Sequence, residues 1–154
     1  MSTVLLAILL ALLLIVAAWG DIRTRTIPNA LNAAIALLAP FWWWAHGLAL
    51  WPDVAMAAGG ALIVFALFAG LFALGAMGGG DVKLLGALAL WFAGIPLLRL
   101  LVVMAIAGGA VTLATLLVHR LRRSPGRPEI PYGVAIALAG LWAMTNDILT
   151  IHAP

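Results

Sequence analysis

Long apolar runs alternate with short polar stretches along the whole chain. Five of the runs reach about 20 residues, the length that an α-helix needs to cross the hydrocarbon core of a bilayer. Polar residues, glycines and prolines gather at the breaks between them. The pattern predicts helices at about residues 3–20, 29–48, 54–76, 82–95, 97–118 and 131–151.

The fourth run is the shortest, and the break Gly94-Ile95-Pro96 separates it from the fifth. Joining the two runs would place a proline inside one very long helix, which the missing N–H and the ring of proline disfavour. We therefore expect an all-α polytopic membrane protein, a single domain over residues 1–154 with six transmembrane helices. A short fourth helix would place Asp81 at its N-terminal end, where water can reach it between the helices.

Composition supports a membrane protein. Of the 154 residues, 66% are apolar and 8% are charged, whereas a soluble domain has about 25% charged residues. The chain has no cysteine, which excludes disulfides, thiolate metal sites and a cysteine nucleophile. Residues 1–20 contain no Lys or Arg, and their apolar run is longer than the roughly 7–15 residues of a signal peptide. We expect a retained first span.

Basic residues are distributed unevenly over the breaks. With the N-terminus outside, the inner loops are 21–28, 77–83 and 119–130, and they contain seven of the eight basic residues. Only Arg99 would lie outside, in agreement with the preference of Lys and Arg for cytoplasmic loops. The net charge of +3 therefore indicates orientation in the membrane rather than nucleic-acid binding. On the other side, four tryptophans around the second break predict an interfacial belt: Trp42, Trp43, Trp44 and Trp51.

Two of the five acidic residues stand at inner breaks. Asp21 ends the first run, where the helix dipole disfavours an acid, and Asp81 begins the fourth helix, where the dipole favours one. Carboxylates near membrane depth are costly and are functional candidates. Two carboxyl groups at close range share a proton, so that the ionised one can activate water while the protonated one polarises a carbonyl group. If the first and fourth helices are neighbours, the pair predicts peptide hydrolysis.

Glycines precede the second aspartate. The run Gly78-Gly79-Gly80 allows backbone conformations that residues with a Cβ avoid. It could let an extended substrate approach the backbone, or let the loop move.

These residues resemble the motifs of the type IV prepilin peptidases, which are membrane aspartyl proteases with a G-x-G-D motif. The motif falls on Gly78 to Asp81 and continues with Val82 and Lys83. The other family aspartate falls on Asp21 within D-x-R-x-x-x-I-P-N, which also contains Arg23, Ile27, Pro28 and Asn29. A third stretch is similar to the start of the family's last helix: Pro131-Tyr132-Gly133-Val134-Ala135-Ile136. The chain looks most like the small CpaA/TadV-type members that serve Flp/Tad pili.

The resemblance implies cleavage of prepilin or pseudopilin leaders after a glycine, at the cytoplasmic face of a bacterial inner membrane. Such substrates would have a short basic leader that ends in this glycine, followed by a long apolar helix. Asp21 and Asp81 would be the catalytic pair, with no metal and no cofactor. The motif and substrate-binding residues would be Gly78, Gly80, Lys83, Arg23, Pro28, Asn29, Pro131 and Gly133. The partners would be precursor proteins and membrane lipid. Since the chain lacks the paired C-x-x-C motifs of larger members, we expect no N-methyltransferase domain.

Two other functions are compatible with six spans. A small transporter would also use membrane aspartates, but it should distribute polar residues through its spans, where Asn32, Thr112 and Thr115 are the main ones. A non-catalytic pilus-assembly subunit would need no matched pair of acids. A metal hydrolase is disfavoured because the three histidines have no H-E-x-x-H-type spacing.

Overall fold

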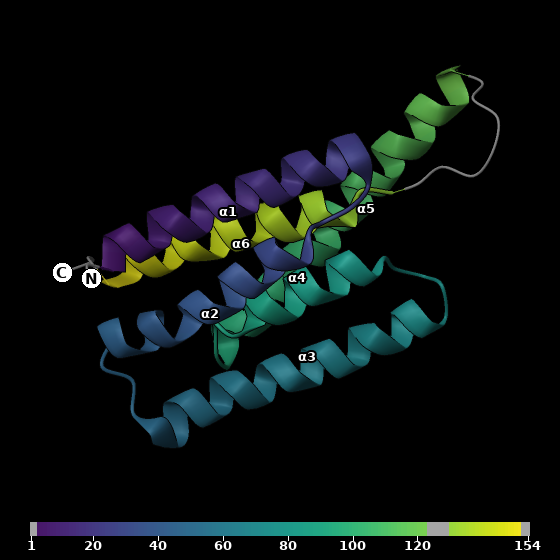
Figure 1. Ribbon diagram of the computed structural model, residues 1–154. Coiled ribbons are helices and arrows are strands. Elements are labelled where there is room, and N and C mark those ends of the chain that lie inside the picture. The colour runs from purple at the N-terminus through teal and green to yellow at the C-terminus, as the bar shows by residue number, and fades with distance from the viewer. Residues whose placement is uncertain (1–2, 123–129, 152–154) are drawn as a thin grey trace.

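The computed structural model describes residues 3–122 and 130–151 of the chain, with side chains as far as residue 146. All regular structure in this part of the chain is helical, which confirms the all-α class and the six expected helices (Figure 1). An irregular helical turn at Leu50–Val54 precedes the third helix. The helices are α1 (Thr3–Thr24), α2 (Asn29–Ala45), α3 (Ala55–Ala73), α4 (Gly79–Ala89), α5 (Ile95–Arg122) and α6 (Tyr132–Ile151). Arg123 and Arg127, which we assign to an inner loop, lie outside the described residues.

Two helix boundaries differ from the expected ones in ways that affect the aspartates. Helix α1 continues to Thr24 instead of ending at residue 20, so Asp21 lies within its last turns. Helix α4 begins at Gly79 and ends at Ala89, earlier at both ends than the apolar run 82–95 suggests. Asp81 therefore lies inside the first turn of α4 rather than before it. Glycine has a low helix propensity, so the local sequence predicts a loop where packing imposes a helix.

Three segments are long and apolar enough to cross a membrane: Thr3–Thr24, Leu50–Ala73 and Ile95–Arg122. Their outer surfaces are apolar as well, with Ile63 and Ile106 about 70% exposed. In water such side chains would be unfavourably placed, whereas lipid solvates them.

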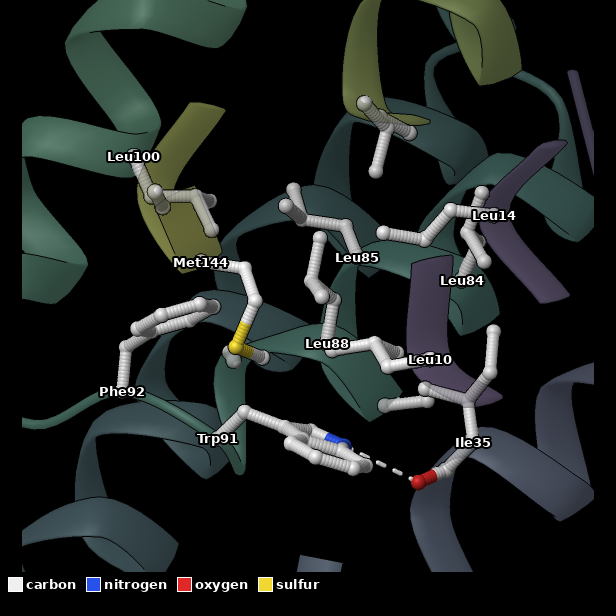
Figure 2. Packing of buried hydrophobic residues seen from close by; sticks show 14 of the residues in the cluster. Leu10, Leu14, Ile35, Leu84, Leu85, Leu88, Trp91, Phe92, Leu100 and Met144 are labelled. Carbon is white, nitrogen blue, oxygen red and sulfur yellow. Dashed lines mark hydrogen bonds between the residues drawn. The ribbon is translucent and has the colours of Figure 1, made fainter. Parts of the chain in front are cut away.

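Helix α4 lies at the centre of the bundle and packs against α2, α3 and α6. Leu84, Leu85 and Leu88 are fully buried, and they meet side chains from α1, α2 and α6 in one core (Figure 2). Beyond the end of α4, the indole N–H of Trp91 donates to the Ile35 carbonyl at 3.0 Å. With only eleven residues, α4 is too short to cross a bilayer alone. Its burial holds Asp81 in a defined place.

The other helices differ in how they are placed around α4. Helices α1 and α6 lie side by side, α5 packs on α6, and α3 packs on α4 at the edge of the bundle (Figure 1). A Cβ at Gly140 would lie 2.8 Å from both Leu14 and Leu88, so this glycine lets α6 approach α1 and α4 closely. Through these contacts the end of α1, the start of α4 and the start of α6 come together.

The tryptophans divide between the surface and the core. Trp44 and Trp51 are exposed, as an interfacial belt requires. Trp42 is only 3% exposed and lies 5.4 Å from Trp91 between ring centroids, while the Trp43 indole donates to the Leu90 carbonyl at 2.8 Å. Since α2 continues through these positions, successive tryptophans point to different faces of one helix.

Candidate active site

The end of α1 places Asp21 inside the bundle. Its side chain is 4% exposed, and its Oδ2 accepts a hydrogen bond from the Val134 N–H at 3.3 Å. The helix ends one turn later, where the Thr24 hydroxyl donates to the Gly20 carbonyl at 2.9 Å. Arg25 then adopts a left-handed backbone conformation, with φ of 55°. This conformation costs a residue with a Cβ about 1–2 kcal/mol, and it turns the chain toward α2.

The start of α4 presents Asp81, which is 8% exposed. Gly78, directly before the helix, has φ of −73° and ψ of 142°, which any residue can adopt. A Cβ at Gly78 would lie 2.8 Å from Oδ2 of Asp81, and one at Gly80 would lie 3.3 Å from the Ile27 Cβ. These two glycines therefore leave room for a carboxyl group and for the incoming chain, rather than supplying the unusual backbone conformations that we expected.

The start of α6 lies against Asp21. A Cβ at Gly133 would lie 2.8 Å from Oδ2 and 3.0 Å from Cγ of Asp21. The backbone N–H of Gly133 acts on the carboxyl groups of both Asp21 and Asp81. A glycine is needed here because the backbone itself lies against the Asp21 carboxyl group.

The two carboxyl groups line one cavity with a volume of about 510 Å³. The lining residues are Asp21, Arg25, Gly75, Ala76, Met77, Gly78, Asp81, Ile130 and Tyr132. The structure therefore brings together two acidic side chains that are 60 positions apart in the sequence. A cavity with two adjacent carboxyl groups has the parts needed for acid and base catalysis on a bound amide.

A model of the type IV leader peptidase family matches residues 8–114, which is more than half of the chain. The chain belongs to the type IV leader peptidase family. The match includes Asp21 and Asp81 and ends within α5. No curated protein and no solved structure matches the chain. The family and the long apolar helices together make this leader peptidase a multi-pass membrane protein.

The environment of the leader peptidase's second aspartate favours its protonated form. Burial, and after it the neighbouring Asp21 carboxylate, raise the pKa of Asp81 to about 7. The N–H groups of Gly78 and Gly133 act in the opposite direction. Desolvation and a like charge both disfavour a second negative charge in the cavity. Near neutral pH, Asp81 can therefore hold the proton that the pair shares.

Several predicted site residues lie beside the cavity rather than in it. The Lys83 ammonium group donates to Oδ1 of Asn29 at 2.9 Å, and Pro28, just before α2, is exposed. The Arg23 guanidinium lies 4.7 Å from the Trp19 ring centroid, on the outside of α1. Pro131 is buried next to Tyr132. Of the predicted motif and substrate-binding residues, Gly78 lines the cavity, Gly133 lies against Asp21, and the Lys83–Asn29 pair connects α4 to α2.

A buried amide strengthens the same connection. Asn32, only 5% exposed, donates from Nδ2 to the Gly80 carbonyl at 3.3 Å. The contact fixes the first turn of α4, which carries Asp81. Asn32, Asn29 and Lys83 thus hold the start of α4 against α2.

Two lining residues with polar side chains are absent from the expected site. Arg25, which we expected only as one of the basic residues of an inner loop, lines the cavity and acts electrostatically on Asp21. Tyr132 also lines it. The sequence contains a signal for Tyr132, because it lies within the stretch that resembles the family's last helix. It contains none for Arg25, since a left-handed residue after a helix is normally glycine.

Metal ligands are not grouped at this site. In the described part of the chain, no three His, Asp or Glu side chains gather in a way that could hold a metal ion.

Proposed function

We propose that this leader peptidase is an aspartic endopeptidase that removes the leader of Flp/Tad-type prepilins or pseudopilins after a glycine. It would do so at the cytoplasmic face of a bacterial inner membrane. The observation that carries this proposal is that two buried carboxyl groups, Asp21 from α1 and Asp81 from α4, line one cavity.

The arrangement favours distinct roles for the two acids. Asp21 takes a proton from a water molecule, and the water oxygen attacks the carbonyl carbon of the scissile peptide bond. Asp81 gives its proton to the carbonyl oxygen, so no isolated oxyanion forms. When the tetrahedral intermediate collapses, the carbonyl re-forms and returns its proton to one carboxyl group. The C–N bond breaks, and the leaving nitrogen takes the proton that Asp21 removed from water.

The orientation in the membrane is also part of the proposal. Six spans with the N-terminus outside would place the cavity on the side where most of the basic residues lie, with Arg99 on the opposite side. Helix α4, which is too short to cross the bilayer alone, would make the fourth crossing together with the residues that follow it, with Asp81 at its cytoplasmic end. Substrate leaders would reach the aspartates from the cytoplasm.

A transport function has less support from the described residues. Thr112 donates to the Gly108 carbonyl at 2.7 Å, and Thr115 donates to the Val111 carbonyl at 2.8 Å, so both hydroxyls are bound within their own helix. Asn32 holds the start of α4. Each of these three polar side chains thus donates to a backbone carbonyl group of the bundle.

Reconstitution tests the proposal directly. The purified protein in liposomes should convert a Flp-type prepilin into a shorter product whose new N-terminus follows the leader glycine, as read by mass spectrometry. An unrelated membrane protein with a basic N-terminus and one apolar helix serves as the control substrate. If the prepilin stays intact while the peptidase is folded and inserted, the proposed activity is wrong.

The cleavage rate should fall as the pH rises through about 7, the pKa of Asp81. Above that pH the proton needed to polarise the carbonyl is lost, and below it the proton is present. The rate should also fall at low pH, when both carboxyl groups are protonated and neither can activate water. The measurement is kcat/KM between pH 5 and 9 in liposomes. A rate that keeps rising up to pH 9 would contradict the role given to Asp81.

A further inference from the structure

A second hollow adjoins the cavity that contains the aspartates. It is a groove of about 540 Å³ between α3, α5 and α6. Its lining residues are Phe68, Leu71, Ala76, Met77, Met104, Ala105, Gly108, Gly109, Thr112, Leu113, Tyr132 and Ile136. No charged side chain is among them. Only Thr112 and Tyr132 carry a hydroxyl group, and that of Thr112 donates to the Gly108 carbonyl. The groove therefore suits an apolar occupant.

The groove is continuous with the candidate active site. Ala76, Met77 and Tyr132 line both hollows. A chain held at the aspartates would pass these three residues and enter the groove directly. A molecule bound in the groove is therefore either part of the chain held at the aspartates or competes with that chain for space.

The helices on the two sides of the groove, α3 and α5, each pack against a different neighbouring helix. Helix α3 packs on α4, and α5 packs on α6, so the groove runs between two separately supported helices. On α5, a Cβ at Gly108 would already be in contact with Tyr132 and Ala135 of α6, at 3.8 Å. At Gly109 it would have nothing within 4 Å. Ala105 and Gly109 thus leave a narrow face of α5 onto which another helix can pack closely in lipid.

We infer that this groove holds the apolar helix of the substrate, beginning directly after the scissile bond, while the aspartates hold that bond. The inference rests on the proposed function and adds which surface recognises the substrate. The two aspartates act on the peptide bond and do not distinguish one substrate side chain from another. A peptidase of this kind therefore needs a second surface to distinguish its substrates from other membrane proteins. An apolar groove joined to the cavity is placed to do so.

The length of the groove limits which substrate residues it contacts. Along α5 it extends from Met104 to Leu113, which corresponds to about 14 Å at 1.5 Å per residue. A substrate helix of about nine residues would fill that length. Recognition should therefore involve the first two to three turns after the cut, and later residues should contact lipid.

Filling the groove tests this inference without touching the aspartates. Gly109→Leu adds a side chain at a position that is open toward the groove. Gly70→Leu on α3 is the matched control, because its Cβ also has nothing within 4 Å and it lines neither hollow. We expect Gly109→Leu to raise KM for a full-length prepilin about tenfold with little change in kcat. Gly70→Leu should stay within about twofold of the wild type.

Crosslinking provides a readout that does not depend on cleavage. The chain contains no cysteine, so one introduced at Leu113 is unique. In an Asp81→Asn background, Leu113→Cys should form a disulfide with a cysteine in the first nine residues of the substrate helix. Ile106→Cys, at an exposed position of α5 that does not line the groove, should not.

The outcomes separate the inference from the proposed function. If the wild type cleaves but Gly109→Leu behaves like Gly70→Leu, the groove does not hold the substrate. Equal crosslinking at Ile106 and Leu113, or crosslinking at neither, would also overturn it and would indicate that lipid fills the groove. If the wild type itself does not cleave, the proposed function falls first.

Discussion

Asp81→Asn and Asp21→Asn should each reduce prepilin cleavage by at least about a thousandfold, because catalytic groups that act as a unit fail together. Asparagine has nearly the shape of aspartate but can neither take a proton from water nor supply one to a carbonyl oxygen at neutral pH. The exchange leaves the apolar core of the bundle unchanged, so both variants should still fold and insert into the membrane. The measurement is product formation from a co-expressed prepilin, with the amount of peptidase in the membrane quantified.

The matched control is Asp53→Asn. Asp53 lies in the turn before α3, where its Oδ2 accepts a hydrogen bond from the Ala49 N–H at 3.0 Å, and it does not line the cavity. The exchange alters charge at an acid outside the site and should leave cleavage within about twofold of the wild type. Substantial cleavage by either Asp21→Asn or Asp81→Asn would contradict the catalytic pair, whatever the control does.

Gly133→Ala should reduce kcat/KM roughly a hundredfold, because displacing a catalytic group by about 1 Å has effects of this size. The added methyl group would lie 2.8 Å from Oδ2 and 3.0 Å from Cγ of Asp21. Either the carboxyl group or the start of α6 must move, and the hydrogen bond from the Val134 N–H to Asp21 is then displaced as well. The measurement is prepilin cleavage in liposomes, together with thermal unfolding in detergent to show that the variant is folded.

The same exchange at an open glycine is the control. Gly59→Ala on α3 places its methyl group where nothing lies within 4 Å. It should leave cleavage unchanged and can even stabilise the helix, since alanine has the higher helix propensity. If Gly133→Ala cleaves as fast as Gly59→Ala, the backbone of α6 is not part of the site.

Much of the fold could be predicted from the sequence because membrane helices leave a strong apolar signal. Each of the six apolar runs corresponds to a helix. The boundaries were predicted less well where packing overrides local preference: two glycines enter the first turn of α4 because α2 and α4 are tied together by Asn32 and Lys83. Six full crossings and an outside N-terminus stay predictions.

The candidate site could be predicted in part. A pair of acids at two breaks identified Asp21 and Asp81, and the structure places them in one cavity. The space that Gly78 and Gly133 leave depends on contacts between segments far apart in the chain, which spacing does not reveal. The same is true of Arg25, whose side chain reaches the cavity because the chain turns with a left-handed residue.

The contact between α6 and Asp21 has a consequence for biosynthesis. Both acids emerge from the ribosome long before residue 133, and the family match ends before that residue. A nascent chain that has inserted only its first five helices therefore contains the two acids but not the Val134 N–H that binds Asp21. The enzyme would become competent only when its last described helix docks, so incomplete translation products would be harmless to the precursors around them.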